Sequence, residues 1–372
     1  MKRFVALVFA LALLFISAPI TNAANIAVTV SEPTHREIDG AFIDDDLTAL
    51  LSYGGRLGQL VFNPPRGNRT WFIDAQLIEE VTAMTSDYVL LGGQKGVGSE
   101  VAKNWLNQLK AITRSDQISA LPFGSPPEYW ISKLAPDKSN FYLSYGAKRL
   151  TALLNRQVNQ MPNYPKVANP KLSYSTITAF KAAQKAIAVN SKYMTQDEIE
   201  KFQGQSAAVL HSDLPAATRT LLALDLRSSS YAISEKIRLA PGRFTVTTTK
   251  QNLPITLIND FPNPAKVSLK IETLNGKVLV GSVPEQTVGG KSKIQVMIPV
   301  EVVTSGKSTL VVNIYSDKNK QLGNQMFYPI TLKVISPIAT WITTGAAIVL
   351  FLSALIQSFR RIKKKRERVA DE

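Results

Sequence analysis

The chain has 372 residues, with 43 Lys or Arg against 28 Asp or Glu, which gives a formal net charge of +15. It contains no cysteine, so disulfides, thiolate metal sites and thiol nucleophiles are excluded. The length predicts two folded domains. A basic surface favours anionic neighbours such as acidic lipid headgroups or wall polymers, and no basic cluster with interleaved aromatic residues supports binding of nucleic acid.

Residues 1–23 have the pattern of a signal peptide. Lys2 and Arg3 precede an apolar run over residues 4–16, and Pro19 and small residues follow up to Ala23, where we expect cleavage. The alternative is an uncleaved anchor, but 13 apolar residues are fewer than the about 20 that cross a bilayer. The sequence therefore predicts export of the chain from residue 24 onward.

Residues 24–165 alternate between strand and helix patterns. Strands are expected over residues 25–30, 70–74, 88–91 and 118–123, and helices over residues 44–57, 75–84 and 99–113. This alternation predicts an α/β domain with parallel strand pairs. Three prolines between Pro162 and Pro170 indicate a loop. Residues 166–233 then predict a helical extension of this domain, in which Thr195 and Glu198 form a capping box.

Residues 234–335 predict an all-β domain. Short alternating strands follow one another at a spacing of about 8 to 12 residues without a helical period, which is typical of an immunoglobulin-like sandwich. Asn275-Gly276 is a hairpin signal that would join a strand over residues 265–271 to one over residues 277–283. This domain ends within a few residues of the apolar segment at residues 338–359, for which a membrane helix is predicted below. We therefore expect the domain to act as a spacer.

Residues 338–359 predict one transmembrane helix. These 22 uncharged residues suffice to cross about 30 Å of hydrocarbon. The tail over residues 360–372 is basic at Arg360, Arg361, Lys363, Lys364, Lys365, Arg366 and Arg368. Since basic flanks stay cytoplasmic, we expect a single-pass protein of the cell membrane with its ectodomain outside. The alternative, a buried core helix, does not explain this tail.

Small residues recur every four positions in the predicted membrane helix, at Ala339, Thr343 and Ala347. Such a stripe allows close approach of helices in lipid. We therefore expect it to be a packing surface, the alternative being ordinary membrane-helix composition.

Histidine and glycine patterns exclude several classes of enzyme. The two histidines, His35 and His211, are far apart, whereas zinc sites of the HExxH kind need a closely spaced pair. A Ser-His-Asp hydrolase is discounted because no GxSxG motif is present, and His211 is expected to be solvated or to cap a helix. The glycines at residues 92–98 lack the Lys-Ser/Thr of a phosphate loop. We expect no cofactor and no metal.

Carboxylates are the remaining route to an enzyme. Asp74 ends an expected strand, at the sheet edge where α/β active sites are built. A glycosidase needs a second carboxylate within about 5 to 10 Å, for which the candidates are Glu128 and the three aspartates at residues 44–46. The alternative for Asp74 is the N-cap of the following helix, which its position favours.

Short motifs in a fixed order carry a resemblance. They are Gly54-Gly55-Arg56-Leu57, Trp71-Phe72-Ile73-Asp74 with Leu77, Ala102 with Trp105-Leu106, Leu121-Pro122-Phe123-Gly124, Pro241-Gly242-Arg243-Phe244, Leu253-Pro254-Ile255 and Asn259-Asp260. With them the chain resembles an actinobacterial family of uncharacterised single-pass envelope proteins with a domain of unknown function. Members of that family tend to be encoded beside the lipid II flippase of peptidoglycan synthesis.

The resemblance implies a reduced form of the barrels of carbohydrate-active enzymes and a partner among membrane proteins of wall biogenesis. Ser125-Pro126-Pro127 stand where the family usually carries aspartates, and the α/β domain is shorter than in relatives. Both departures argue against retained catalysis.

Two functions follow as expectations. The first is a non-catalytic, membrane-anchored envelope protein, accessory to cell-wall or surface-polysaccharide biogenesis through protein or glycan binding. The alternative is a carbohydrate-active hydrolase that uses Asp74 and a second carboxylate. A purely structural or adhesive protein would contain repeats or several sandwich modules, which the sequence lacks.

Overall fold

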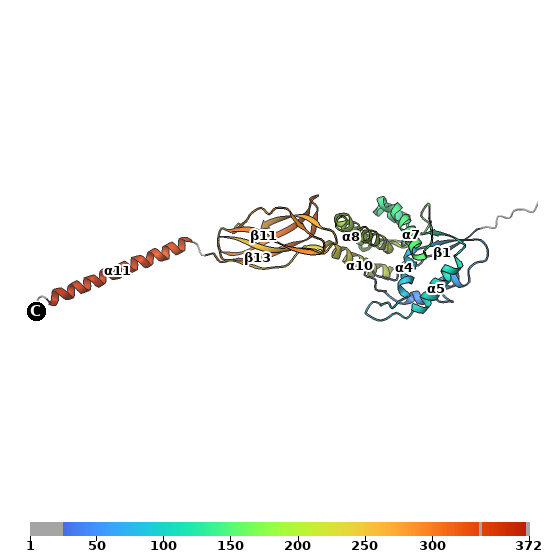
Figure 1. Cartoon of the computed structure of the whole chain (residues 1–372), viewed down its shortest axis with the longest axis horizontal. Helices are drawn as coiled ribbons and strands as arrows, with labels where there is room; N and C mark the ends of the chain where they lie inside the picture. Colours follow the sequence, from blue (N-terminus) through green and yellow to red (C-terminus); the bar gives the residue numbers. More distant parts are fainter. Residues whose placement is uncertain (1–24, 335–336, 370–372) are drawn as a thin grey trace, which may run out of the picture. The chain divides into compact units, whose positions relative to one another are not determined.

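The computed structural model describes residues 25–334 and 337–369 (Figure 1). The signal peptide expected over residues 1–23 lies outside these residues. The chain forms two compact units, the first comprising Met1–Ile187 and Gln196–Ser230 and the second comprising Ala188–Thr195 and Tyr231–Glu372. The protein is a mixed α/β structure with curled β-sheets and one apolar C-terminal helix.

A four-stranded parallel sheet organises the first unit. Its strands are β1 (Ile26–Val30), β2 (Arg69–Ile73), β3 (Gln117–Ala120) and β4 (Asn159–Gln160), in the spatial order β1-β2-β3-β4. Each strand pairs in parallel with the next one along the chain, which confirms the predicted parallel pairs. Because the order never reverses, the sheet curls in one direction, as half of a (β/α)8 barrel does.

Helices cross over between these strands. They are α2 (Asp46–Leu51), α3 (Arg56–Phe62), α4 (Ala75–Met84), α5 (Ser99–Ile112), α6 (Glu128–Leu134) and α7 (Ser139–Leu154), with a 3₁₀ turn η2 at Pro136–Lys138. The single helix expected over residues 44–57 is wrong, because the chain leaves the helix after α2 and starts a second one. A Cβ at Gly55 would lie 2.2 Å from the carbonyl oxygen of Ala49, so only glycine allows this close return of the backbone.

The strand expected over residues 88–91 is also wrong. Its backbone makes only isolated bridges, from Leu90 to Phe42 and from Val89 to Lys95. The aromatic ring of Tyr88 packs against that of Phe42. The segment therefore closes a loop rather than adding a strand to the sheet.

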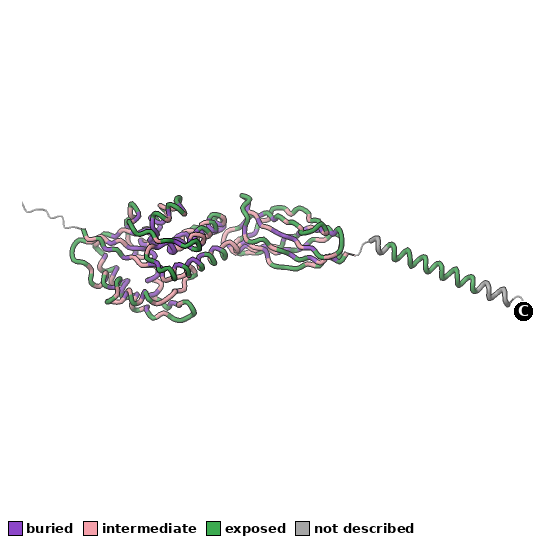
Figure 2. The backbone as a smooth tube through the Cα atoms, turned by 180° about the vertical axis from the view of Figure 1, so that it is seen from behind, coloured by how far each residue is buried: buried purple, intermediate pink, exposed green. Residues whose placement is uncertain are grey.

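Only one face of the parallel sheet belongs to the core. Val30, Trp71 and Ile73 are fully buried on that face with the apolar side of the crossover helices. Figure 2 colours the buried stretches of the backbone purple. On the opposite face Ala27 and Thr29 are exposed. Parallel sheets are normally covered on both faces, so this open face is unusual.

A helical segment continues the first unit, as the sequence predicts. It contains α8 (Tyr174–Asn190), α9 (Gln196–Ser206), η3 (Ala207–Leu210) and α10 (Ala216–Ser234). The backbone of Ala208 in η3 approaches Gly124, since a Cβ built on this glycine would lie 3.6 Å from it. Asp225 of α10 accepts a 2.9 Å hydrogen bond from the backbone N–H of Ile38. The segment thereby covers part of the edge at which the parallel strands end.

Two sheets make up the folded part of the second unit. Their strands are β5 (Ile237–Leu239), β6 (Phe244–Val246), β7 (Lys250–Asn259), β8 (Ala265–Thr273), β9 (Val278–Val280), β10 (Gln286–Val288), β11 (Ser292–Val302), β12 (Gly306–Ser316) and β13 (Gln321–Leu332). The spatial orders are β10-β8-β12-β13-β6 and β5-β7-β11-β9. All pairs are antiparallel except β13 with β6.

The hairpin predicted at Asn275-Gly276 is wrong, because the chain passes there from one sheet to the other. β8 pairs with β10 and β12, whereas β9 pairs with β11. The Asn275 side chain explains the turn, since Oδ1 accepts hydrogen bonds from the N–H of Lys277 and the hydroxyl of Ser308 at 3.2 and 2.9 Å. These bonds shape a local turn that needs no pairing between the flanking strands.

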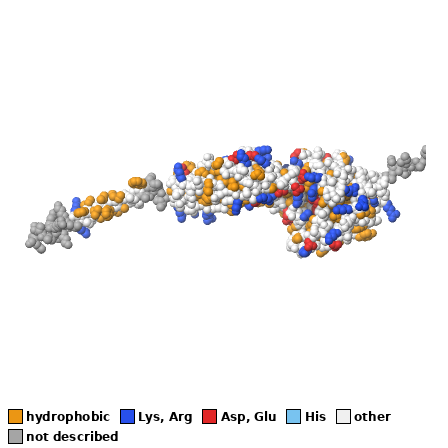
Figure 3. All heavy atoms as spheres, in the orientation of Figure 1, with side chains coloured by type: hydrophobic (Ala, Val, Ile, Leu, Met, Phe, Trp, Pro, Cys, Tyr) orange, Lys and Arg blue, Asp and Glu red, His pale blue; other side chains and the backbone are white. Residues whose placement is uncertain are grey.

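The last element is α11 (Pro337–Val369). Among the described residues, one stretch within it, Trp341–Arg361, is long and apolar enough to cross a membrane. Apolar side chains dominate its visible surface in Figure 3. Arg360 and Arg361 of the basic tail are exposed at its end, whereas the side chains of the tail lysines lie outside the described residues.

Candidate functional site

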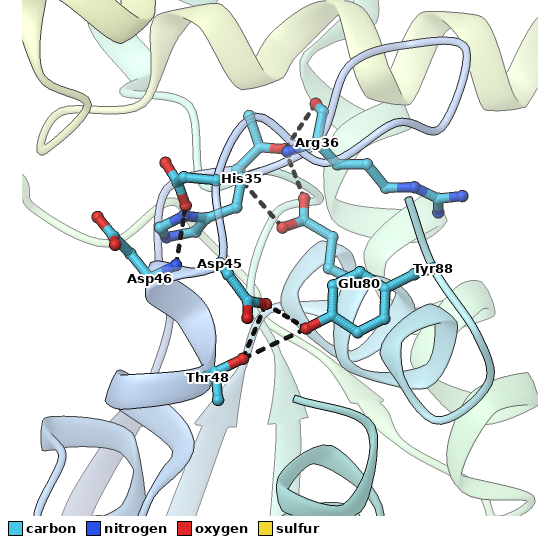
Figure 4. A network of polar contacts seen from close by, with 9 residues as sticks. His35, Arg36, Asp45, Asp46, Thr48, Glu80 and Tyr88 are labelled. Atoms are coloured by element: carbon cyan, nitrogen blue, oxygen red, sulfur yellow. Dashed lines mark hydrogen bonds and ion pairs between the residues drawn. The ribbon is translucent and has the colours of Figure 1, made fainter. Parts of the chain in front are cut away.

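The carboxyl end of β1 leads into a loop that buried polar contacts hold in place (Figure 4). Glu80 of α4 is buried and accepts hydrogen bonds from Thr34 and from the backbone N–H of His35, the latter at 3.0 Å. Burial raises the pKa of Glu80. Asp44 contacts Nδ1 of His35 at 2.7 Å. These groups fix the loop, which is a structural role.

Two of the aspartates considered as second carboxylates are engaged at the start of α2. Asp45 accepts hydrogen bonds from Tyr88 and, at 2.9 Å, from Thr48, as Figure 4 shows. The backbone N–H of Asp46 donates to Asp44 at 3.1 Å. The carboxylates of Asp44 and Asp45 therefore organise the beginning of the helix.

A groove of about 380 Å³ lies on the open face of the parallel sheet, at its carboxyl edge. Its apolar part comes from Ala27, Phe72 and Leu121, and Met161, Pro165 and Val167 follow from the loop after β4. Its polar part comes from Thr29, Ser31, Ser125, Lys166, His211, Ser212 and Asp213. Pockets of this size, with apolar walls and a few converging polar groups, are typical of small-ligand sites.

A chain of polar side chains connects this groove to the buried carboxyl group of Asp74. Nδ1 of His211 accepts the backbone N–H of Asp213 at 3.1 Å, so in the neutral ring the proton is on Nε2. Nε2 lies 3.5 Å from Oγ of Ser31. Ser31 donates to Ser125 at 3.2 Å, and Ser125 donates to Oδ2 of Asp74 at 2.7 Å. The donors therefore all point toward Asp74.

Asp74 is fully buried and caps α4, as its position after a strand predicts. Its Oδ1 accepts the backbone N–H groups of Gln76 at 2.9 Å and of Gly124 at 3.1 Å. Burial raises the pKa of Asp74 to about 7, although the hydrogen bonds from Ser125 and the two backbone groups act in the opposite direction.

The turn at Gly124 and Ser125 aims both donors at Asp74. Both residues have left-handed backbone conformations, with φ of 73° and 44°. The positive φ favours glycine at position 124, where a Cβ would also displace Oε1 of Gln76, 2.6 Å away. For Ser125 this conformation costs about 1–3 kcal/mol, which the bonds of this turn help to offset.

Glu128 does not share a site with Asp74 in this structure. It lies exposed on the first turn of α6, whereas Asp74 has no exposed surface. Two carboxylates of a glycosidase must both face the substrate in one cleft. Among the described residues that line the groove, the one carboxylate is that of Asp213, which is exposed.

His211 is not solvated, as one sequence-based expectation had it, because only 4% of it is exposed. Burial lowers its pKa to about 4; the carboxylate of Asp213 acts in the opposite direction, and Arg219 and Arg56 add to the lowering. The ring is therefore neutral at pH 7. Since Nδ1 already accepts a backbone N–H and Nε2 carries the proton, the ring offers Ser31 no free nitrogen for general-base activation.

Among the described residues, no cluster of His, Asp and Glu could hold a metal ion. What the groove can do is accept and donate hydrogen bonds beside an apolar wall. Sequence reasoning overlooked Ser31, which follows directly on a predicted strand end, and treated Ser125, two residues beyond the strand expected over residues 118–123, only as a departure from the pattern of the resembled family. A search of all polar residues at such ends, rather than of carboxylates alone, would have found both.

A family model described as a family of unknown function (DUF6049) matches residues 152–372, which is more than half of the chain. The chain belongs to that family. The match includes His211 and Asp213 of the groove, both sheets of the second unit and α11. The predicted resemblance to an uncharacterised family is thereby confirmed at this level. No curated protein matches the sequence.

Solved structures match only part of the chain. Native alpha-2-macroglobulin of Escherichia coli is 15% identical, with a TM-score of 0.22, over 26% of this chain and 6% of its own length. WR4, an MSP family member of C. elegans, is 13% identical, with a TM-score of 0.21, over 26% of this chain and 98% of its own length. The PapD-like domain 7 of human CEP192 is 11% identical, with a TM-score of 0.22, over 27% of this chain and 85% of its own length.

Proposed function

We propose that this protein is a non-catalytic, membrane-anchored envelope protein that binds a glycan in the groove on the open face of its parallel sheet. In this proposal it is accessory to the biogenesis of a cell wall or surface polysaccharide. The two sheets of the second unit act as an immunoglobulin-like spacer, the first unit lies outside the cell, and the tail is cytoplasmic.

The observation that carries the proposal is the groove itself. A sugar ring has an apolar face and a rim of hydroxyl groups, and the groove offers both complements. Phe72 supplies a partly exposed aromatic surface, while Ser31 and Thr29 supply hydroxyl groups beside it. The neutral His211 and the buried Asp74 support binding rather than hydrolysis, because neither presents a free acid or base to a ligand.

Binding of wall and surface oligosaccharides to the purified full-length protein in nanodiscs tests the proposal. Phe72→Ala is expected to weaken binding at least about tenfold, or about 1.4 kcal/mol, because it removes the aromatic wall. Tyr53→Ala is the matched control, since Tyr53 is 68% exposed in the same unit and does not line the groove. Equal affinities for both variants, or no binding by the unmodified protein, would refute the proposal.

The alternative, a carbohydrate-active hydrolase, rests on the pKa of Asp74 of about 7, which suits a general acid. In that case the turn at Ser125 must open to expose the carboxyl group. Hydrolysis of a glycan by the unmodified protein, lost in Asp74→Asn, distinguishes this alternative from binding alone.

The proposed partner is a membrane protein of wall biogenesis. The groove and α11 offer it an extracellular and a membrane-embedded contact, respectively. Affinity purification of the tagged full-length protein from membranes tests this part, with a variant whose α11 is replaced by an unrelated transmembrane helix as the control.

A further inference from the structure

One end of the two-sheet unit collects the strand termini that lie next to α11 in the chain. In the register of the sheets, Leu332 at the end of β13 pairs with Gly306 and with Val246. At the same end Val302 pairs with Val278. The β8–β9 turn, the β11–β12 turn and the end of β13 therefore form one surface.

Lysines and exposed apolar side chains share this surface. Lys307 and Lys333 are exposed and Lys277 is partly exposed, and none of the three forms an ion pair within the part of the chain that the structure describes. Leu274 and Val303 are 68% and 59% exposed on the neighbouring turns.

The two carboxylates nearest in the chain are already engaged by other lysines. Glu301 pairs with Lys250 at 3.5 Å, and Glu272 pairs with Lys270 at 3.0 Å. The surface therefore presents unneutralised positive charge beside apolar groups. This combination is what an anionic bilayer surface binds.

The covalent chain brings this surface to the bilayer. Only residues 333–336 separate β13 from α11, and an extended chain bridges that gap over at most about 18 Å. If Trp341–Arg361 crosses the membrane, the surface must stay close to the headgroups, wherever the rest of the protein is oriented.

We propose that this end of the two-sheet unit rests on anionic lipid headgroups of the membrane that α11 enters. Lys277, Lys307 and Lys333 contact the headgroups, and Leu274 and Val303 enter the interfacial region. A lysine close to an anionic surface contributes about fivefold to binding, so the three together favour the membrane-bound orientation about 100-fold.

The full-length protein reconstituted in nanodiscs tests this inference, and its lack of native cysteine makes single labels specific. An environment-sensitive fluorophore is attached to Val303→Cys, and a reference label to Lys318→Cys in the turn between β12 and β13. In nanodiscs that contain phosphatidylglycerol, lipid-attached quenchers should quench the label at position 303 and leave that at position 318 bright. Phosphatidylcholine alone, or high salt, should reduce the quenching.

Two sets of charge variants distinguish an effect of the lysines on this surface from an effect of the net charge of the protein. Replacing Lys277, Lys307 and Lys333 together by Gln should lower the ratio of quenched to unquenched label at position 303 about 100-fold. Replacing Lys291, Lys293 and Lys320 by Gln removes the same charge from the opposite end and should leave the ratio unchanged. Quenching that is independent of lipid charge, or that falls equally in both triple variants, overturns the proposal.

Discussion

Oγ of Ser125 lies 2.7 Å from Oδ2 of Asp74, a carboxyl group without any exposed surface. The residue that would be the catalytic acid of this sheet edge is thus closed off from the groove by a serine hydroxyl. A ligand in the groove meets Ser125 and Ser31, both of which line it, and not the carboxylate behind them. This relationship is the structural reason to expect binding in place of hydrolysis.

Asp74 and His211 are expected to give the stability of the first unit opposite dependences on pH. The pKa of Asp74 is raised to about 7, so between about pH 4 and 7 the folded state keeps a proton that the unfolded chain loses, and the free energy of unfolding falls as pH rises. The pKa of His211 is lowered to about 4, so up to about pH 6.5 the unfolded chain holds the extra proton and the free energy rises.

Single variants should reveal how much each group changes the free energy of unfolding with pH, at most about 1.4 kcal/mol per pH unit for each. Relative to the unmodified protein, Asp74→Asn should become more stable as pH rises through this window, and His211→Gln less stable. Urea unfolding followed by tryptophan fluorescence measures this, since Trp71 and Trp105 are buried in the first unit. Changes of the same sign in both variants would contradict the assignment.

The hydrogen-bond acceptors of the side chain at position 74 should decide the stability of the sheet edge. Asp74→Ala leaves two backbone N–H groups and the Ser125 hydroxyl without their acceptor, and each such loss costs about 1–3 kcal/mol. Asp74→Asn keeps an oxygen for the backbone groups and should cost only about 1 kcal/mol. Thermal unfolding of both variants tests this, and an equal loss in both would contradict the capping role.

The orientation of the chain can be tested with introduced cysteines. Lys318→Cys, in an exposed turn of the second unit, should react with an impermeant thiol reagent in intact cells. Val369→Cys, at the end of α11, should react only after the cells are opened if the tail is cytoplasmic, as the basic residues beside it predict. Equal labelling of both positions in intact cells would reverse or abolish the proposed topology.

The small residues of α11 predict association within the membrane. Ala339, Thr343 and Ala347 lie four residues apart in one helix and so on one stripe. Replacing all three by Leu should leave insertion unchanged and weaken detergent-resistant association with itself or a membrane partner. Leu replacing Ile342, Ile348 and Ile356 introduces three leucines outside the stripe and is the control for leucine content. If association is unaffected by the first triple variant, the helix serves only as an anchor.

Periodicity along the chain predicted the elements whose signals are local. The parallel pairs of the first unit and the helical segment after residue 166 follow from the alternation of strands and helices and from capping residues. The long helix over residues 44–57 failed because the contact that breaks it is tertiary, the approach of Gly55 to the carbonyl oxygen of Ala49. The hairpin at Asn275 failed because strand partners depend on which sheet each strand joins, and the turn residues do not encode that choice.

The candidate site likewise combines features that the sequence determines with features that only the tertiary structure decides. The sequence by itself determined that Asp74 ends a strand and caps a helix, because a cap requires only neighbouring residues. It also determined that the chain has no thiol chemistry and one apolar C-terminal segment. Only the tertiary structure decided that Ser31, Ser125 and His211 form a polar chain to Asp74. Ser31, Asp74 and Ser125 meet there because parallel strands end at one edge of a sheet, and the turn after η3 brings in His211, 180 positions from Ser31. The direction of this hydrogen-bonded chain is set by the backbone N–H of Asp213, which fixes the imidazole tautomer.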